Sequence, residues 1–336
     1  MKVLISDYID RMMPDHDLEI ETLRSGLGDD VEIEIWPYTD EQREEFYRRL
    51  SSADALLTAF IPMDADAFAH APLLKVIAID ATGYDNVDLV EATRHGVGVC
   101  PVGEYCTWDV SEAAIAYLFA LNKLFKYFMN KVESEHVWGF ADAPAYPRLQ
   151  DQVLGIVGFG KIGKCTARKA KDLVKEVIAC DPYADSAAFE ELGVRRVGKE
   201  ELLSSADLIV NHMNLTTENE RYFDAAAFDL MSARAPIFVN LGRGLSVDED
   251  ALVKALDAGT IRAFGADVLG DETPDLAHHP LMGRSNVIVT PHSAFYSSSS
   301  LRDLETLPAK NIVAFLSGSK QDLFKLVNDV DVRDCR

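Results

Sequence analysis

The chain has 336 residues and a formal net charge of −22 at pH 7. Hydrophobic residues make up 48% of it and charged residues 26%, as in globular proteins. This length suggests two domains, and no apolar stretch is long and uncharged enough to span a bilayer. The negative charge repels phosphate groups, which argues against nucleic acid or anionic membranes as partners.

The start of the chain and the cysteines indicate the compartment. Residues 1–7 read as a first β-strand and lack the features of a signal peptide, so we expect a cytoplasmic protein. The five cysteines have neither CxxC nor Cys/His spacing, so we expect reduced thiols and no metal site; they are Cys100, Cys106, Cys165, Cys180 and Cys335.

The first hundred residues alternate short apolar runs with helical patterns, which predicts a parallel sheet. The expected strands are 3–6, 31–36, 55–58, 76–80 and 97–100, with helices at 41–51 and 87–95. A long helix follows to about residue 129, with Thr107 as its expected N-cap. It is apolar on too many sides for one surface face, so it either links two domains or packs against a second subunit. Residues 138–148 read as an irregular arm.

A second alternating run begins near residue 152. Its expected strands are 153–157, 177–180, 208–211, 237–240, 263–267 and 287–290, which match the doubly wound dinucleotide-binding plan. A last helix at about 301–317 is expected to return to the first domain. The predicted fold class is therefore α/β, with two doubly wound parallel-sheet domains. Residues 101–297 would form a Rossmann NAD-binding domain that includes a dimerisation helix and the arm; residues 1–100 and 298–336 would form a smaller, flavodoxin-like substrate domain.

A glycine-rich turn follows the strand expected at 153–157. Its sequence, Gly-Phe-Gly-Lys-Ile-Gly at 158–163, opens a helix, and this context gives the GxGxxG pattern its meaning. The helix N-terminus would hold a pyrophosphate. Asp181 ends the next strand and is the expected partner of a ribose 2′-OH. Because no arginine follows it directly, we predict NAD as the cofactor; the turn's predicted contacts are Gly158, Gly160, Lys161, Ile162 and Gly163.

Three later segments each begin where an apolar run ends. They are Asn-Leu-Gly-Arg-Gly at 240–244, Asp-Val-Leu-Gly-Asp-Glu at 267–272 and Thr-Pro-His at 290–292. In an open parallel sheet, ligands lie beyond the carboxyl ends of the strands. An arginine, an acid and a histidine placed there can bind an anion and move a proton, which indicates an oxidoreductase.

With Gly-Tyr-Asp-Asn-Val-Asp at 83–88, these segments make the chain resemble the D-isomer-specific 2-hydroxyacid dehydrogenase family along nearly its whole length. Parts of it are similar to the D-lactate dehydrogenase branch and to the C-terminal binding proteins. The resemblance implies that Arg243 pairs with the substrate carboxylate and that His292 is the general acid in reduction. It also implies that Glu272 hydrogen-bonds the histidine and favours its protonated form.

The resemblance implies further contacts. Asp267 would face the nicotinamide, and other cofactor contacts would come from Met213, Asn214, Asn219, Leu241, Gly242 and Arg243. Substrate contacts would come from Thr82, Gly83, Tyr105 and Arg243, and the position of Phe295 makes it a further candidate. Asn214 stands where many relatives have proline, and Thr273 is an extra residue after the acid. The aromatic residues Phe60, Tyr105 and Phe295 would favour a bulky apolar or aromatic oxo acid.

Structural interpretations of the same residues stay open. Arg243 would then cap a loop, His292 would be a strand-end histidine, and Glu272 would be solvated. His212 reads as structural or cofactor-lining, and His278 and His279 as surface-loop residues.

The predicted function is reversible, NAD-dependent reduction of a 2-oxo acid to a D-2-hydroxy acid by a homodimer. One alternative is an NADH-sensing scaffold similar to the corepressors of the C-terminal binding protein group, although the chain lacks a low-complexity tail. A phosphite dehydrogenase is another alternative. Formate dehydrogenases resemble the family but carry glutamine in the role given to Glu272.

Overall fold

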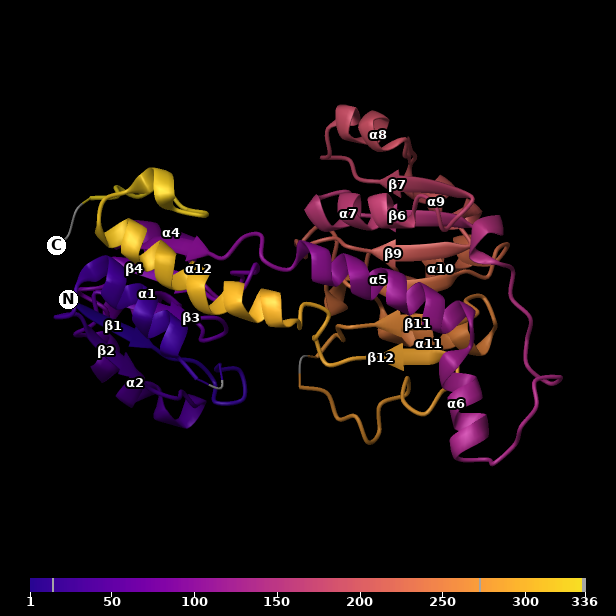
Figure 1. Cartoon of the computed structure of the whole chain (residues 1–336), viewed down its shortest axis with the longest axis horizontal. Coiled ribbons are helices and arrows are strands. Elements are labelled where there is room, and N and C mark those ends of the chain that lie inside the picture. The colour runs from indigo at the N-terminus through magenta and orange to yellow at the C-terminus, as the bar shows by residue number, and fades with distance from the viewer. Residues whose placement is uncertain (14, 272, 334–336) are drawn as a thin grey trace. The chain divides into compact units, whose positions relative to one another are not determined.

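The computed structural model describes residues 1–13, 15–271 and 273–333. It divides into two compact units, of which unit 1 comprises Met1–Tyr105 with Ser297–Arg336 and unit 2 comprises Cys106–Tyr296 (Figure 1). Two residues singled out from the sequence, Glu272 and Cys335, lie outside the described residues. Each unit is an α/β structure built on a parallel sheet, so the predicted fold class is confirmed.

In the described part of unit 1, a five-stranded parallel sheet has the order β2-β1-β3-β4-β5. This order is that of the flavodoxin-like doubly wound fold, with its switch point between β1 and β3. Strands β3 and β4 are buried at every position, as expected for a sheet covered on both faces. The strands are β1 (Lys2–Ile5), β2 (Glu32–Ile35), β3 (Ala55–Thr58), β4 (Val76–Ile79) and β5 (Gly98–Pro101).

The helices of unit 1 include two that the sequence patterns did not predict, α1 and α3. Helix α12 begins after a capping box formed by Ser297 and Ser300, and it packs against α1 and β4. The chain's last helix therefore lies with its first strands (Figure 1). The elements are α1 (Asp17–Leu27), η1 (Asp40–Gln42), α2 (Arg43–Leu50), α3 (Ala65–Ala69), α4 (Leu89–Arg94), α12 (Ser298–Leu316) and η4 (Lys320–Asp322).

The described residues of unit 2 form a seven-stranded parallel sheet of order β12-β11-β10-β9-β6-β7-β8. Counted from β6, this is the 3-2-1-4-5-6 order of dinucleotide-binding folds with one more strand, and its switch point lies between β6 and β9. All six predicted strands are present, and the short β8 is additional. The strands are β6 (Val153–Val157), β7 (Glu176–Cys180), β8 (Arg195–Arg196), β9 (Leu208–Asn211), β10 (Ile237–Asn240), β11 (Ala263–Ala266) and β12 (Val287–Val289).

The long helix expected from Thr107 to about residue 129 is two helices, α5 (Thr107–Asn122) and α6 (Phe125–Glu133). The break falls at Leu124, whose φ of 58° is left-handed and interrupts the helix. Cys106, not Thr107, occupies the N-cap position of α5. The apolar character of α5 is explained within unit 2, because the helix packs against α7 and strands β10 and β11. Gly265 in β11 permits this approach, since a Cβ there would lie 2.6 Å from the Tyr117 ring.

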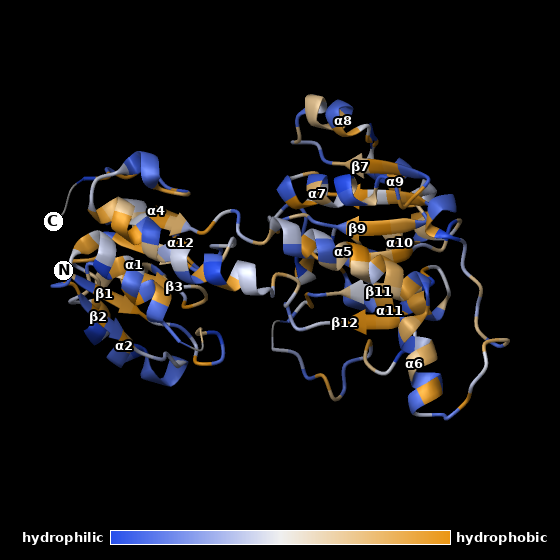
Figure 2. Ribbon diagram, viewed as in Figure 1, coloured by the Kyte–Doolittle hydropathy of each residue, from blue (hydrophilic) through white to orange (hydrophobic). Residues whose placement is uncertain are grey.

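The remaining helices of unit 2 cover the sheet, and their apolar residues face it. Figure 2 shows the strands β6, β7 and β9 as mostly hydrophobic, with hydrophilic residues on the helices around them. The elements are η2 (Leu149–Asp151), α7 (Lys161–Ala170), α8 (Ser186–Leu192), α9 (Lys199–Ser205), α10 (Ala225–Met231), η3 (Gly244–Ser246) and α11 (Glu249–Asp257). Residues 138–148, expected to be an irregular arm, contain no helix or strand.

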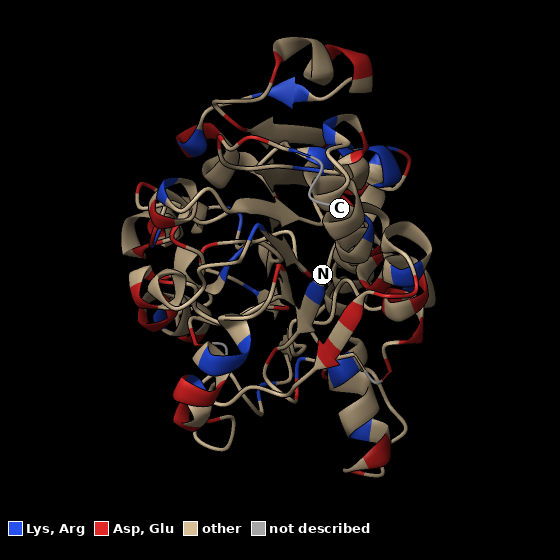
Figure 3. Cartoon of the chain, turned by 90° about the vertical axis from the view of Figure 1, so that its left-hand side faces the viewer, with Lys and Arg blue, Asp and Glu red and all other residues tan. Residues whose placement is uncertain are grey.

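The surface reflects the composition of 55 acidic and 33 basic residues. Acidic side chains are spread over helices and loops and are not confined to one segment (Figure 3). Over the described ranges, no helix is long and apolar enough to cross a membrane. Within the same ranges no group of three His, Cys, Asp or Glu side chains can hold a metal ion, and Cys100, Cys106, Cys165 and Cys180 are free of disulfides.

Candidate active site

The glycine-rich turn between β6 and α7 has the geometry of a pyrophosphate site. Gly158 has a φ of +87°, and a Cβ there would lie 2.8 Å from the backbone nitrogen of Met213. A Cβ on Gly163 would lie 2.1 Å from the carbonyl oxygen of Gly158, so the third glycine lets α7 pack on the turn. A Cβ on Gly160, by contrast, would meet no atom within 4 Å. Gly160 caps α7 without a side-chain bond, so these residues fit a dinucleotide at the helix N-terminus.

Asp181 lies directly after β7, and its carboxylate is bonded to the turn. Oδ2 accepts the backbone N–H of Phe159 at 2.7 Å, and Oδ1 accepts that of Tyr183 at 2.9 Å. The carboxylate is therefore held beside the glycine turn, where a ribose hydroxyl is expected. Sequence reasoning considered only residues that follow Asp181 and missed Arg196 of β8, which donates to the carbonyl oxygens of Asp181 and Pro182 at 3.0 and 3.2 Å.

The loops after β9 and β10 are tied together by buried amides. Asn211 donates to the side chain of Asn240 at 2.9 Å and to the hydroxyl of Ser246 at 3.0 Å. Asn240 and Ser246 in turn donate to the carbonyl oxygen of Arg243 at 3.1 and 2.6 Å. The backbone of Arg243 is thus fixed from inside the unit, while its half-buried guanidinium donates to the Gly242 carbonyl at 3.0 Å. Sequence analysis missed the roles of Asn211 and Ser246.

Glycine also allows these loops to touch. A Cβ on Gly242 would lie 2.5 Å from the carbonyl oxygen of Met213, and one on Gly244 would lie 1.7 Å from that of Leu269. Among the other expected cofactor contacts, Leu241 is buried. The Asn219 amide closes its own turn, donating to the Asn214 carbonyl at 2.7 Å. The cofactor roles of Met213, Asn214, Asn219 and Leu241 stay predictions.

The loop that carries His292 is organised by Asp267, which is 3% exposed. Its carboxylate accepts the hydroxyl of Thr290 and the backbone N–H groups of Ser293 and Ala294, the latter two at 2.9 and 2.7 Å. The backbone N–H of His292 donates to the Asp267 carbonyl at 2.8 Å. His292 has a φ of 53°, a left-handed conformation uncommon outside glycine. These bonds hold that conformation, so Asp267 positions the histidine whatever contact it makes with a cofactor.

His212, at the end of β9, is buried and contacts a neighbouring helix. Its Nε2 lies 2.9 Å from the hydroxyl of Thr166 on α7. Burial lowers the pKa of His212 to about 3, so its imidazole is neutral at physiological pH. It therefore cannot exchange a proton with a substrate near neutral pH.

The remaining expected substrate residues lie in both units. Thr82, Gly83 and Tyr105 belong to unit 1, whereas Phe295 belongs to unit 2 with Arg243 and His292. The Thr82 hydroxyl donates to the Gly103 carbonyl at 3.1 Å. The structure thus brings Arg243, Asp267 and His292 to the carboxyl ends of β10, β11 and β12 in one sheet. The substrate roles of the unit 1 residues and of Phe295 stay predictions, as does that of Glu272.

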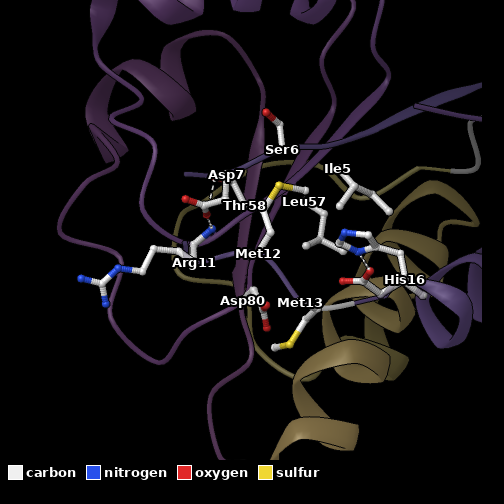
Figure 4. A pocket seen from close by; sticks show the side chains of 12 residues that line it. Ile5, Ser6, Asp7, Arg11, Met12, Met13, His16, Leu57, Thr58 and Asp80 are labelled. Carbon is white, nitrogen blue, oxygen red and sulfur yellow. Dashed lines mark hydrogen bonds and ion pairs between the residues drawn. The ribbon is translucent and has the colours of Figure 1, made fainter. Parts of the chain in front are cut away.

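Unit 1 has a pocket of its own, of about 20 Å³, at the carboxyl ends of β1 and β3 (Figure 4). Asp7 and Asp80 line it, with Arg11, Met12 and His16 around them. Oδ1 of Asp80 is buried without a hydrogen-bond partner among the described residues. Burial, aided by the nearby negative charges, raises the pKa of Asp80 well above its ordinary value. The volume suits one water and is too small for a 2-oxo acid.

Comparisons with known proteins agree with this geometry. Residues 115–294 match the family described as D-isomer specific 2-hydroxyacid dehydrogenase, NAD binding domain. The chain is 31% identical over 319 residues to a glyoxylate reductase of Pyrococcus furiosus, covering 93% of this chain and 92% of that one. It is 33% identical over 300 residues to a hydroxypyruvate reductase of Blautia hydrogenotrophica, covering 87% and 91%.

A solved structure shares the whole fold. It is a D-lactate dehydrogenase of Aquifex aeolicus complexed with NAD and lactic acid, similar with a TM-score of 0.85 and 25% identity over 97% of this chain and 99% of that one. The glycine turn, the arginine and histidine loops and these matches lead to one conclusion: the chain is an oxidoreductase that belongs to the D-isomer specific 2-hydroxyacid dehydrogenase family.

Proposed function

We propose that this chain reduces a 2-oxo acid to the D-2-hydroxy acid with NADH. The observation that carries the proposal is the placement of Arg243 and His292 after β10 and β12, at the same sheet edge as the glycine turn after β6. In this proposal unit 2 is the NAD-binding domain and unit 1 is the substrate domain.

Each residue has a defined part in the proposed reaction. The Arg243 guanidinium pairs with the substrate carboxylate and polarises the 2-oxo group, because a planar guanidinium suits two parallel hydrogen bonds. His292 gives a proton to the oxygen of the 2-oxo group and takes it back in the reverse direction. Glu272 hydrogen-bonds the imidazole and orients it. The bound nicotinamide supplies the hydride, and the protein supplies position and charge.

Asp181 supports NADH over NADPH. A carboxylate held at the ribose site accepts a 2′-hydroxyl and repels a 2′-phosphate. Arg196 acts in the other direction and would favour a 2′-phosphate, because its guanidinium lies against the same turn. The carboxylate dominates in our proposal because it is bonded to the glycine turn itself, through Phe159.

The first substrates to test are short 2-oxo acids. The relatives named above are glyoxylate, hydroxypyruvate and D-lactate enzymes, which act on acids with small side chains. A bulkier acid such as phenylpyruvate is the second candidate, favoured by the 44% exposed Phe60 and the partly exposed Phe295.

We also propose that the chain forms a homodimer through α6 and the arm. Exposed apolar residues repeat along α6 at Phe125, Met129 and Val132, and the arm exposes Trp138 and Phe140. An exposed apolar face of this kind is typical of an interface. Light scattering of the purified protein would measure the mass, and Trp138→Ser with Phe140→Ser should shift it towards the monomer.

The experiment that tests the proposed function is the loss of NADH absorbance across a panel from glyoxylate through pyruvate and hydroxypyruvate to phenylpyruvate. The panel is repeated with NADPH, and phosphite with NAD is included in the oxidative direction. Turnover of a 2-oxo acid with NADH supports the proposal. Turnover of phosphite alone, or NADH binding without any turnover, contradicts it and favours the phosphite or the scaffold alternative.

A further inference from the structure

One carboxylate in unit 2 bonds both ends of an exposed loop. Glu249 is the first residue of α11, and its Oε1 accepts the backbone N–H of Gly270 at 2.7 Å. Its Oε2 lies 3.4 Å from Nε2 of His279. The two contacts fall on either side of residues 271–278, so Glu249 links the two ends of this loop. The proposed role of Glu272 gives that loop its importance, because Glu272 lies in it.

The contact at the second end of the loop, between Glu249 and His279, is connected to the core. Nδ1 of His279 lies 3.4 Å from the backbone N–H of Leu281, which is fully buried. A neutral histidine with its proton on Nε2 satisfies both contacts, accepting at Nδ1 and donating to Glu249. The sequence predicted a surface position for His279, but its side chain is only 12% exposed. Its contact with Glu249 explains the difference.

The contact at the first end of the loop, between Glu249 and Gly270, lies beside the loop that carries Arg243. Leu269 is buried, and its carbonyl lies so close to Gly244 that a Cβ there would be 1.7 Å away. The chain therefore leaves β11 at a fixed point and reaches Gly270, where Glu249 accepts its N–H. Glu249 follows Arg243 closely in the sequence, so one stretch of chain carries both the arginine and the carboxylate that links the ends of the loop.

Between Gly270 and His279, the loop contains short-range hydrogen bonds. Asp271 accepts the backbone N–H of Thr273 at 2.8 Å, and Asp275 accepts that of Ala277 at 3.2 Å. Asp271, Thr273, Asp275 and Leu276 are exposed. Such local turns do not fix where the loop lies relative to the sheet. Among the described residues, the contacts that do so are those of Glu249 and those of the buried Leu269 and Leu281.

We propose that Glu249 is a positioning residue that holds the Glu272 loop in place for catalysis. The proposal rests on the proposed function, because that function gives a catalytic role to Glu272, which lies between Gly270 and His279 in the sequence. A catalytic group on an exposed loop needs such support, since a misplacement of about 1 Å can cost about 10²-fold in rate.

The test compares five variants of the full-length protein. Glu249→Ala removes both contacts, whereas Glu249→Gln keeps an oxygen that accepts from Gly270 and replaces the oxygen that faces His279 with an NH2 donor. Asp250→Ala is the matched control, because Asp250 is the neighbouring acidic residue in the first turn of α11 and is exposed. Glu272→Gln supplies the reference for loss of the catalytic acid, and it is also combined with Glu249→Ala.

We expect Glu249→Ala to lower kcat by about 10- to 100-fold, with KM for NADH changed less than about 2-fold. It should move the pH profile of kcat/KM in the same direction as Glu272→Gln does. Added to Glu272→Gln, it should cause little further loss, because both act through one group. Glu249→Gln should lose less activity than Glu249→Ala because it keeps the bond from Gly270, and Asp250→Ala should retain full activity.

Two kinetic results would overturn the proposal. One is a loss in the double variant equal to the product of the single losses, which would mean that Glu249 acts independently of Glu272. The other is an unmoved pH profile in Glu249→Ala with a rise in KM for NADH, which would mark a general structural role.

Amide hydrogen exchange of residues 270–281 separates this proposal from the proposed function, since it needs no turnover. Faster exchange in Glu249→Ala, but not in Asp250→Ala, supports the proposal that Glu249 holds the two ends of the loop. Normal turnover with unchanged exchange in Glu249→Ala contradicts the role of Glu249 and leaves the proposed function intact. Absence of turnover by the wild-type protein overturns the proposed function and, with it, the catalytic role of Glu249.

Discussion

Asp267 after β11 in unit 2 and Asp7 after β1 in unit 1 occupy comparable places at the carboxyl edges of their sheets. They are 3% and 5% exposed, and each carboxylate organises a neighbouring loop. Asp267 accepts from the loop around His292, whereas Asp7 accepts from the loop after β3, including the backbone N–H of Phe60 at 2.9 Å. In both units a buried carboxylate, bonded to several N–H groups, fixes a loop that the sheet alone would leave free.

The two edges differ in what else they hold. In unit 2 the neighbours of Asp267 are the amides that fix Arg243, and all of these buried groups have partners. In unit 1 the neighbour of Asp7 is Asp80, whose Oδ1 has none among the described residues and whose pKa is raised by burial. The side chains that fix the loops of Arg243 and His292 have hydrogen-bond partners, whereas the unpartnered Oδ1 of Asp80 makes the stability of unit 1 depend on pH.

The largest expected effect concerns the chemistry at the unit 2 edge. His292→Ala should lower kcat by about 10²–10⁴-fold, as is typical of a general acid. NADH binding, followed by fluorescence titration, should stay within about 2-fold because the glycine turn is intact. His278→Ala, at an exposed histidine, is the control. A collapse of NADH affinity in His292→Ala would show that the residue had been assigned to the wrong part of the site.

The next effect separates the two loop-organising carboxylates. Asp267→Ala and Asp7→Ala each leave several buried donors without an acceptor, so each should lower the free energy of unfolding by about 2–4 kcal/mol. Urea unfolding measures this loss. Only Asp267→Ala should also lower kcat by about 10-fold or more, because it frees the loop that carries His292. Equal losses of kcat in both variants would remove the difference drawn between the edges.

A third carboxylate, Asp181, extends the comparison to the cofactor. Asp181→Ser keeps an acceptor near the glycine turn but removes the charge that repels a 2′-phosphate. The ratio of kcat/KM for NADPH to that for NADH should rise about 10-fold, the effect of about 1.4 kcal/mol. Asp181→Ser combined with Arg196→Ala should show a smaller rise if the guanidinium contacts the phosphate. No change in the ratio would place the ribose elsewhere.

The smallest effect tests the unpartnered group in unit 1. Because the folded pKa of Asp80 is raised, its stabilising contribution is complete below its unfolded pKa and is lost as pH rises through the folded value. Asp80→Asn should therefore raise the melting temperature most at pH 8, by about 2–4 °C, and least near pH 4. A gain that is equal at all pH values would mean that Asp80 keeps the same charge in the folded and unfolded chain.

Much of the fold could be predicted because its strands are local signals. The runs at β3, β6 and β9 are short, apolar and bounded by polar residues, and a parallel sheet buries such runs on both faces. Helix α1 was missed because acidic and basic residues dilute its apolar periodicity. The break at Leu124 was missed because no glycine or proline marks it.

The site could be predicted in part for the same reason. The glycine turn and the residues after each strand are visible in the sequence, because strand ends and GxGxxG spacing are local. The contacts of Arg196 with the Asp181 turn and of Glu249 with Gly270 join segments 14 or more residues apart. Such contacts depend on how strands and loops align in space, which spacing in one sequence does not specify.

The measurement that tests the central claim most directly is the product formed from NADH carrying deuterium at C4 of the nicotinamide. Chiral chromatography and mass spectrometry of the 2-hydroxy acid give its configuration and its deuterium content. The account predicts the D-isomer with deuterium at C2 when the transferred position is labelled, and a large loss of this product in His292→Ala. An L-isomer, or bound NADH with no reduced product from any 2-oxo acid, would contradict it.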